Sequence, residues 1–266
     1  MPAEQVAEPF RKGVAVGDEF ARRFSDLWRT PFLIGLTTLV RERDGERRYN
    51  GAILIAPPGV EVARYAKNYC IPFGEYIPFE KTLPFMKWLS PYDSDYSVAA
   101  GETLTLFPFG ATPFAVLVCY EDTVPHLGRQ FMAGPVQPAF FLNISNDGWF
   151  KGWEEHEQHL AVARFRAVET RRALARSVNM GVSAIIDGNG AVVALLPGAR
   201  TLSEGKAKPG VVIGRVPLDQ RGSLYVLLGD WLPAGCWLMV IVGLLAALLQ
   251  LRREERRDAA AAAPAL

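Results

Sequence analysis

The sequence is short of cysteine, of histidine and of net charge. Its 266 residues include three cysteines and three histidines, and 29 Lys and Arg against 28 Asp and Glu give a formal net charge of +1. Cys70, Cys119 and Cys236 are far apart, which excludes a zinc ribbon or a C-x-x-C redox pair. The near-zero charge excludes a general attraction to nucleic acid. Half of the residues are apolar, which excludes a disordered chain.

One long hydrophobic run lies near the C-terminal end. Residues 231–251 carry no charge, and as a helix they would be about 31 Å long, close to the thickness of a bilayer core. A buried core helix is the alternative, but such helices rarely run this long without polar residues. Four arginines follow within 252–257, so the positive-inside rule places the C-terminus in the cytoplasm and residues 1–225 outside it. We predict a transmembrane helix, then a basic and Ala-rich cytoplasmic tail at 252–266 with a disordered end.

Alternating strands and helices are predicted for residues 1–225. A helix is expected at 155–173, and the sequence Asp187-Gly188-Asn189-Gly190 predicts a hairpin turn. The strand candidates are 32–40, 51–57, 103–107, 113–119, 138–144, 182–187, 191–196 and 210–216. Several of them are almost wholly apolar, as is typical of strands covered on both faces. The pattern therefore indicates an α/β layered domain.

Cys119 lies in the first of three polar clusters that follow apolar segments. It ends a strongly apolar strand and precedes Tyr120, Glu121 and Asp122, so its thiol would stand at a strand-to-turn junction. A buried structural cysteine is the alternative. Two carboxylates beside the thiol argue against it, because they are costly inside a core unless they are paired or chemically active.

Lys67 and Glu75 lie in the second cluster, residues 64–78, whose prolines and glycine exclude a regular helix. Held in a packed loop, the two side chains could stabilise an oxyanion. A solvated lysine and a turn-stabilising glutamate fit the sequence as well. The third cluster, residues 143–150, follows an apolar strand, and α/β folds place their sites at such strand ends. Turn chemistry alone also favours its Asn, Asp and Gly residues.

Together the clusters resemble one family. The patterns are Y-x-K-x-x-x-x-P-F-G-E-Y-x-P at 65–78, C-Y-E at 119–121, N-I-S-N-D-x-W-F at 143–150, Q-H-x-x-x-A-R-x-R-A-x-E at 158–169 and R-x-x-N-x-G at 176–181. They resemble the carbon–nitrogen hydrolase (nitrilase) superfamily. More narrowly, with the C-terminal hydrophobic run, they resemble the apolipoprotein N-acyltransferases, the membrane enzymes that add the third acyl chain to bacterial lipoproteins. The resemblance implies a nitrilase-like αββα sandwich and a Glu–Lys–Cys triad.

The resemblance also implies roles for particular residues. By position, Cys119 would be the nucleophile, and Lys67 would stabilise the tetrahedral intermediate. The family's base is a glutamate in a W-P-E pattern, which this sequence lacks; the nearest candidate is Glu4 in Met1-Pro2-Ala3-Glu4. The residues that the resemblance places around the site are Glu75, Tyr120, Glu121, Asn146 and Trp149. The family has further membrane helices before this domain, so we expect a fragment or a misplaced start.

The implied reaction is acyl transfer in two steps. Cys119 would take an acyl chain from a phospholipid as a thioester and pass it to the amine of a diacylglyceryl-cysteine apolipoprotein. The implied location is the bacterial inner membrane, with the catalytic domain facing the periplasm. A membrane-anchored amidase and a non-catalytic remnant remain as alternatives. His156 and His159 lack a third ligand at suitable spacing, so we expect no metal site and no cofactor.

Overall fold

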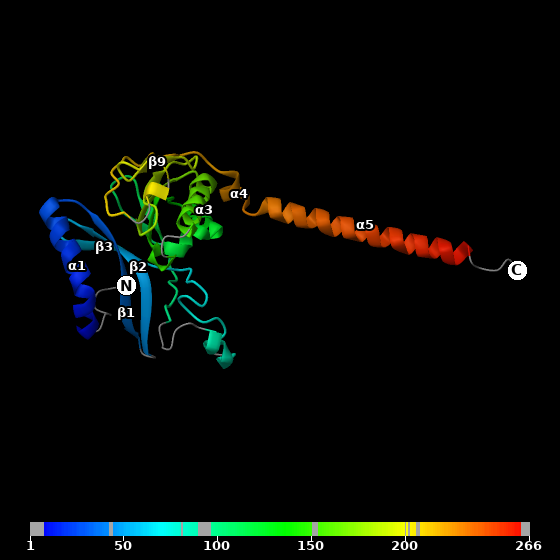
Figure 1. Ribbon diagram of the computed structural model, residues 1–266, viewed down its shortest axis with the longest axis horizontal. Coiled ribbons are helices and arrows are strands. Elements are labelled where there is room, and N and C mark those ends of the chain that lie inside the picture. Colours follow the sequence, from blue (N-terminus) through cyan, green and yellow to red (C-terminus); the bar gives the residue numbers. More distant parts are fainter. Residues whose placement is uncertain are drawn as a thin grey trace. The chain divides into compact units, whose positions relative to one another are not determined.

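The computed structural model describes residues 8–42, 45–80, 82–89, 97–150, 154–199, 201, 203–205 and 208–261. The chain divides into two compact units, Met1–Val226 and Leu227–Leu266. The first unit contains both sheets and the helices that cover them (Figure 1).

An antiparallel three-stranded sheet, in the order β1-β2-β3, follows the first helix, α1 (Glu8–Trp28). Its strands are β1 (Phe32–Glu42), β2 (Gly45–Ala56) and β3 (Val60–Ala66). Along β2, Ile53 and Ile55 pack with Ala21 of α1, whereas Ala52 and Leu54 join the core that is shared with the second sheet. Because side chains alternate between the faces of a strand, β2 contributes to the core on both sides.

A six-stranded sheet in the order β4-β5-β6-β7-β8-β9 forms the next layer. Its strands are β4 (Leu106–Phe107), β5 (Phe114–Val118), β6 (Phe140–Asn146), β7 (Ala173–Asn179), β8 (Ala184–Ile186) and β9 (Val192–Leu195). The central strands β5, β6 and β7 are parallel, and the other pairs are antiparallel. Every residue of β5 is buried, as expected for an apolar strand covered on both faces.

Helices complete the αββα sandwich on both sides. Helix α3 (Glu155–Thr170) buries Leu160, Ala163 and Ala167 in the core of the six-stranded sheet, beside α2 (Pro125–Met132). Helix α1 covers the three-stranded sheet (Figure 1). The short 3-10 turns are η2 (Pro84–Leu89), η3 (Cys119–Thr123), η4 (Asp147–Phe150) and η5 (Ser203–Gly205). The predicted nitrilase-like layering is confirmed.

Helix α5 (Trp231–Ala261) makes up most of the second unit, after the short α4 (Leu224–Leu228). Among the described residues, one helix, Trp231–Glu254, is long and apolar enough to cross a membrane by length and composition. The helix continues through 258–261, where the sequence predicted disorder. Alanine has the highest helix propensity, which accounts for this difference.

Three of the predicted elements differ clearly from the structure. Of the predicted strand at 103–107, only Leu106–Phe107 forms a strand, β4. The predicted strand at 210–216 pairs with none of the strands in the described part of the chain; instead Gly214 lies against Ile185 and Ala194, so this segment packs on the side chains of β8 and β9. The predicted helix at 155–173 ends at Thr170, because Arg171 adopts a left-handed conformation with φ 52°. The chain then enters β7, which the sequence analysis did not predict.

Candidate active site

Cys119 begins the η3 turn at the end of the buried strand β5. Its φ of 52° lies in the left-handed region, which side chains other than glycine rarely adopt. Asn143 of β6 holds this turn, because its Nδ2 donates to the carbonyl oxygens of Leu117 (3.1 Å) and Cys119 (3.3 Å). Strained backbone fixed by its neighbours is typical of functional sites. The Cys119 side chain is half-buried, so it is not enclosed in the core.

Glu121 joins the Cys119 turn to the segment that carries Lys67. Its Oε2 accepts a hydrogen bond of 2.7 Å from the backbone N–H of Val118, and its Oε1 accepts one of 2.7 Å from the backbone N–H of Asn68. The side chain is fully buried. One carboxylate therefore fixes the backbone before Cys119 to the backbone after Lys67.

The surroundings of Glu121 are apolar or neutral. Burial raises the pKa of Glu121, and the hydrogen bonds from Val118, Tyr65 and Asn68 act in the opposite direction. The Tyr65 hydroxyl donates to Oε1 at 2.8 Å. Burial and the facing Glu121 carboxylate also raise the pKa of Tyr65. Tyr65 is therefore a neutral phenol that keeps its proton for this hydrogen bond.

Lys67 follows β3 and is fully buried, so the alternative of a solvated lysine is wrong. Its Nζ lies 2.6 Å from Oε2 of Glu75. Glu75 is held in turn by the backbone N–H of Ile71 (2.8 Å) and by Nδ2 of Asn50 (2.9 Å). A buried ammonium needs a paired negative charge, and here the pair is fixed by hydrogen bonds from the same loop and from β2. The loop thus presents a positioned cation.

Cys70 lies in the same loop but differs from a nucleophilic cysteine. Burial and the charge of Glu75 raise the pKa of its thiol to about 11. Only a thiolate is nucleophilic, so Cys70 is unreactive at neutral pH.

The remaining predicted site residues lie nearer the surface. Asn146 ends β6, and its Oδ1 accepts hydrogen bonds from Nδ2 of Asn179 (2.8 Å) and from the backbone N–H of Gly148 (3.2 Å). Trp149 is 69% exposed, and Tyr120 is 38% exposed. Glu4 lies outside the described residues.

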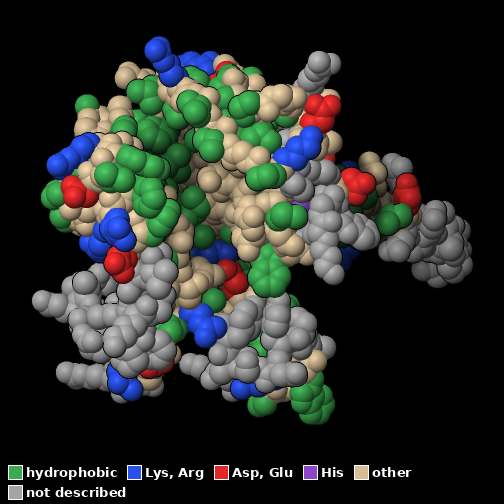
Figure 2. All heavy atoms as spheres, turned by 60° about the vertical axis from the view of Figure 1, so that its left-hand side comes forward, with side chains coloured by type: hydrophobic (Ala, Val, Ile, Leu, Met, Phe, Trp, Pro, Cys, Tyr) green, Lys and Arg blue, Asp and Glu red, His purple; other side chains and the backbone are tan. Residues whose placement is uncertain are grey.

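Exposed aromatic residues lie in the segment that follows the Lys67 loop. Phe79, Phe85 and Trp88 are between 53% and 88% exposed, so they are not core residues. Figure 2 shows hydrophobic side chains spread over the face that it presents. Apolar side chains in contact with solvent are suited to apolar ligands or to a lipid surface.

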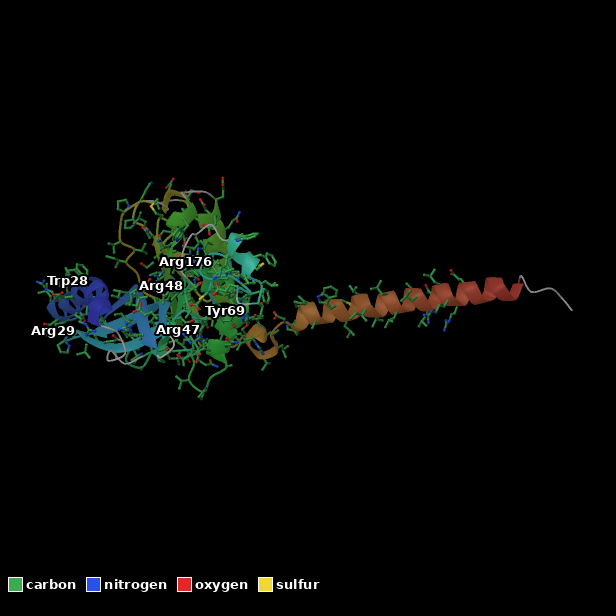
Figure 3. The ribbon with its side chains drawn as sticks, turned by 90° about the horizontal axis from the view of Figure 1, so that it is seen from below. Trp28, Arg29, Arg47, Arg48, Tyr69 and Arg176 are labelled. Atoms are coloured by element: carbon green, nitrogen blue, oxygen red, sulfur yellow. The ribbon has the colours of Figure 1, made fainter. Side chains whose placement is uncertain are left out.

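A second group of buried charges follows the Cys119 turn. We call Asp122, Asp147, His159 and Arg176 the ionic cluster; each is more than nine-tenths buried. His159 bonds to both aspartates, through Nε2 to Oδ1 of Asp122 (2.7 Å) and through Nδ1 to Oδ2 of Asp147 (3.0 Å). Arg176, which is labelled in Figure 3, forms an ion pair with Asp122, and its Nη2 lies 3.9 Å from Oδ2 of Asp147.

The protonation of this cluster follows from its contacts. Burial lowers the pKa of His159, but the hydrogen bonds to Asp122 and Asp147 outweigh it and raise the pKa to about 10. Burial likewise opposes the charge of Asp147, but the bonds from His159 and Ser145 lower its pKa below the usual value. The cluster therefore holds cations and anions together.

Residues of the R-x-x-N-x-G pattern at 176–181 contact the ionic cluster and the end of β6. Arg176 pairs with Asp122, and Asn179 donates to Asn146. A Cβ at Gly181 would collide with the carboxylate of Asp147, so only glycine permits this close approach. The sequence analysis gave the ionic cluster no role. The available signal was that Asp147, His159 and Arg176 each belong to one of the patterns that carry the family resemblance, and that Asp122 directly follows another.

Comparisons with known proteins agree with this architecture. Residues 2–224 match the family model for carbon-nitrogen hydrolases. Apolipoprotein N-acyltransferase of Geobacter metallireducens is 34% identical over 215 residues, which cover 80% of this chain and 38% of that protein. Apolipoprotein N-acyltransferase 2 of Treponema denticola is 30% identical over 240 residues, which cover 84% and 41%. The chain thus spans about two fifths of the length of these relatives.

Solved structures share the fold. An amidase from Nesterenkonia sp. AN1 superposes with a TM-score of 0.55 at 19% identity, covering 89% of this chain and 81% of that one. A carbon-nitrogen hydrolase from Helicobacter pylori G27 gives a TM-score of 0.52 at 14% identity, covering 70% and 64%. These likenesses concern the fold alone.

Proposed function

Since the chain belongs to the carbon–nitrogen hydrolase family, we propose that it forms the catalytic part of an N-acyltransferase. The acyl chain moves from a phospholipid, through a thioester on Cys119, to the N-terminal amine of a diacylglyceryl-cysteine apolipoprotein. The names of the relatives from Geobacter metallireducens and Treponema denticola support this acceptor class.

The bridging carboxylate of Glu121 is the observation that carries the proposal. It bonds to the backbone on the N-terminal side of Cys119 and to the backbone on the C-terminal side of Lys67. A thiol on a strained turn and a buried ammonium are thus tied into one structural unit. This arrangement suits a nucleophile and an oxyanion-stabilising cation.

In the first half-reaction, the Cys119 thiolate attacks the carbonyl carbon of a phospholipid ester. The Lys67 ammonium stabilises the tetrahedral oxyanion, which collapses to a thioester as the lysophospholipid alcohol leaves with a proton. In the second half-reaction, the free amine of the apolipoprotein attacks the thioester and forms an amide. The amine gives its proton to the catalytic base as the C–S bond breaks, and Cys119 regains its thiolate.

Glu4 is our candidate for the base that accepts the thiol proton and returns it to the leaving alcohol. It lies within the part of the chain that matches the family model, although outside the described residues.

Helix α5 supports a membrane location for the proposed reaction. We assign residues 231–251, within the apolar helix Trp231–Glu254, as a membrane span, with Arg252 and the following arginines on the cytoplasmic side by the positive-inside rule. The domain before it then faces the periplasm of a bacterial inner membrane. Phospholipid is the acyl donor in the same bilayer, and the exposed aromatics Phe79, Phe85 and Trp88 are suited to contact it.

Acyl-thioester trapping tests the proposal. The full chain in membranes is incubated with phospholipid labelled in its acyl chains and then treated with neutral hydroxylamine. We expect a hydroxylamine-labile label on the wild-type protein and on a Cys70→Ala control, and none on Cys119→Ala. An absence of label on a folded, membrane-inserted wild-type protein would overturn acyl transfer by this chain.

The same fold also occurs in amidases, which use water as the acceptor. If short amides were hydrolysed in a Cys119-dependent manner while phospholipid left no label, the chain would be a membrane-anchored amidase. If neither reaction depended on Cys119, the chain would be a non-catalytic member of the family.

A further inference from the structure

His159 occupies the centre of the ionic cluster, between two loops of the site. We propose that His159 is a positioning residue, an imidazolium that is charged throughout the neutral range and holds the Cys119 turn and the η4 turn of Trp149 in place. This inference deepens the proposed function, because those loops would serve the acyl-transfer reaction.

The geometry requires both ring nitrogens of His159 to donate. Nε2 faces Oδ1 of Asp122 at 2.7 Å, and Nδ1 faces Oδ2 of Asp147 at 3.0 Å. A carboxylate only accepts hydrogen bonds, and a neutral imidazole has one donor and one acceptor. Only the imidazolium therefore satisfies both contacts.

Charge balance leads to the same state. Asp122 and Asp147 are anions, and Arg176 supplies one cation from β7. A neutral His159 would leave a net negative charge in a buried site, which is costly. Ser145 donates to Oδ1 of Asp147 at 2.5 Å but brings no charge.

Within the described part of the chain, α3 itself brings two further titratable groups to the cluster. Glu155 lies 4.0 Å from Nδ1 of His159, and its pKa is raised by burial and by the charge of Asp147. His156 bonds through Nε2 to the carbonyl oxygen of Asp147 at 3.0 Å. Because the pKa of His159 is raised to about 10, the imidazolium persists throughout the neutral range.

The contacts of His159 connect it to two turns of the candidate site. Asp122 belongs to the same 3-10 turn as Cys119, and Asp147 begins the η4 turn that contains Trp149. Loss of the imidazolium charge would leave two carboxylates facing the single cation of Arg176, and so one excess negative charge beside the turn that contains Cys119. Nearby negative charge raises the pKa of a thiol, so the reactivity of Cys119 would shift to higher pH.

Nitrogen NMR of the imidazole rings tests the charge directly, on the full wild-type chain in detergent micelles. The His159 signal is assigned by its loss in His159→Gln. We expect both ring nitrogens to remain protonated from pH 6 to above 8. A neutral His159 ring at pH 7 would overturn the proposal. If His159→Gln did not fold, the loss of one signal each in His126→Gln and His156→Gln would assign the remaining signal to His159.

The rate of Cys119 alkylation by iodoacetamide tests the positioning role without any acyl donor. Mass spectrometry of the peptides reads each cysteine separately, over a range of pH. We expect about tenfold slower alkylation of Cys119 at neutral pH in His159→Gln, with the profile displaced to higher pH. The cation-retaining His159→Lys should recover part of the rate, and the matched His126→Gln should match wild type.

An unchanged Cys119 profile in a folded His159→Gln would overturn the positioning role. Alkylation is independent of the acyl acceptor and donor. If His159→Gln slows Cys119 alkylation but the wild-type protein takes no phospholipid label, the proposed function is rejected and the positioning role of His159 is kept. If the wild-type protein takes the label but His159→Gln alkylates normally, the proposed function is kept and the positioning role is rejected.

Discussion

Glu121 and Asp122 are neighbours in one turn and are both fully buried, yet they lie in opposite kinds of surroundings. Glu121 accepts hydrogen bonds from backbone N–H groups and from the neutral Tyr65 hydroxyl. Asp122 faces two cations, His159 and Arg176. The difference shows that the fold satisfies one carboxylate with dipoles and the next with full charges.

The two kinds of surroundings have different consequences. Burial raises the pKa of Glu121, and the hydrogen bonds from its neutral neighbours act against this shift. Replacing the Asp122 carboxylate by a neutral group would leave the cations of His159 and Arg176 in excess. The loss of a negative charge should therefore cost less at Glu121 than at Asp122.

The substitution Asp122→Asn should have the largest effect on stability. It removes one anion from between two buried cations, and breaking such a pair costs about 3–5 kcal/mol. Chemical denaturation of the detergent-solubilised chain measures this loss of unfolding free energy. A loss no larger than that of Glu121→Gln would contradict the contrast between the two carboxylates.

The pH dependence of stability should come next in size. The raised pKa of His159 stabilises the folded state fully below its ordinary value, near 6.5, and this contribution is lost as the pH rises to about 10. We expect the unfolding free energy to fall across this range in the wild-type protein. The unfolding free energy of His159→Gln should decrease less over the same pH range. An equal decrease in both proteins would show that His159 is not charged in the cluster.

The substitution Glu121→Gln should cost less, about 1–3 kcal/mol. The amide oxygen can keep the bonds from Tyr65 and Asn68, while the amide nitrogen cannot accept the bond from the N–H of Val118. Denaturation measures the loss, and the alkylation rate of Cys119 shows whether the turn has moved. A loss above that of Asp122→Asn would show that dipoles, rather than charges, dominate here.

Cys70 should give the smallest effect. With its pKa raised to about 11, its alkylation at pH 8 should be slow and should increase only in strong alkali. The substitution Cys70→Ala should leave the thioester label on Cys119 unchanged. Rapid alkylation of Cys70 at pH 8 in the folded protein would contradict the environment described for this loop.

The candidate site could be predicted from the sequence in part. Cys119 follows the apolar run that forms β5, whereas Lys67, which the family resemblance singled out, follows β3, a strand that alternates polar and apolar residues and was not predicted. The ionic cluster could not be predicted in this way. Asp122 lies 37 positions from His159 and 54 from Arg176, and the three meet only when β5, β6 and β7 pair.

The secondary structure was predictable where an apolar segment is also a buried strand, and less predictable where contacts with other elements determine the backbone conformation. The all-apolar β5 was predicted within two residues of its bounds. The segment 210–216 has the composition of a strand, but its glycines let it lie on the side chains of β8 and β9 without pairing. Helix α1 was missed because its composition is polar on average, and its apolar residues lie on one face only at helical spacing.

The long sequence separations in the ionic cluster bear on the order of folding. Contacts between distant residues form after local ones, because the entropy of closing the intervening loops must be overcome first. The charges of Asp122 and Arg176 can leave water only once three parallel strands have assembled around them. We therefore expect the Cys119 turn to reach its final conformation late, so that the candidate site is complete only in chains that have already formed the sandwich.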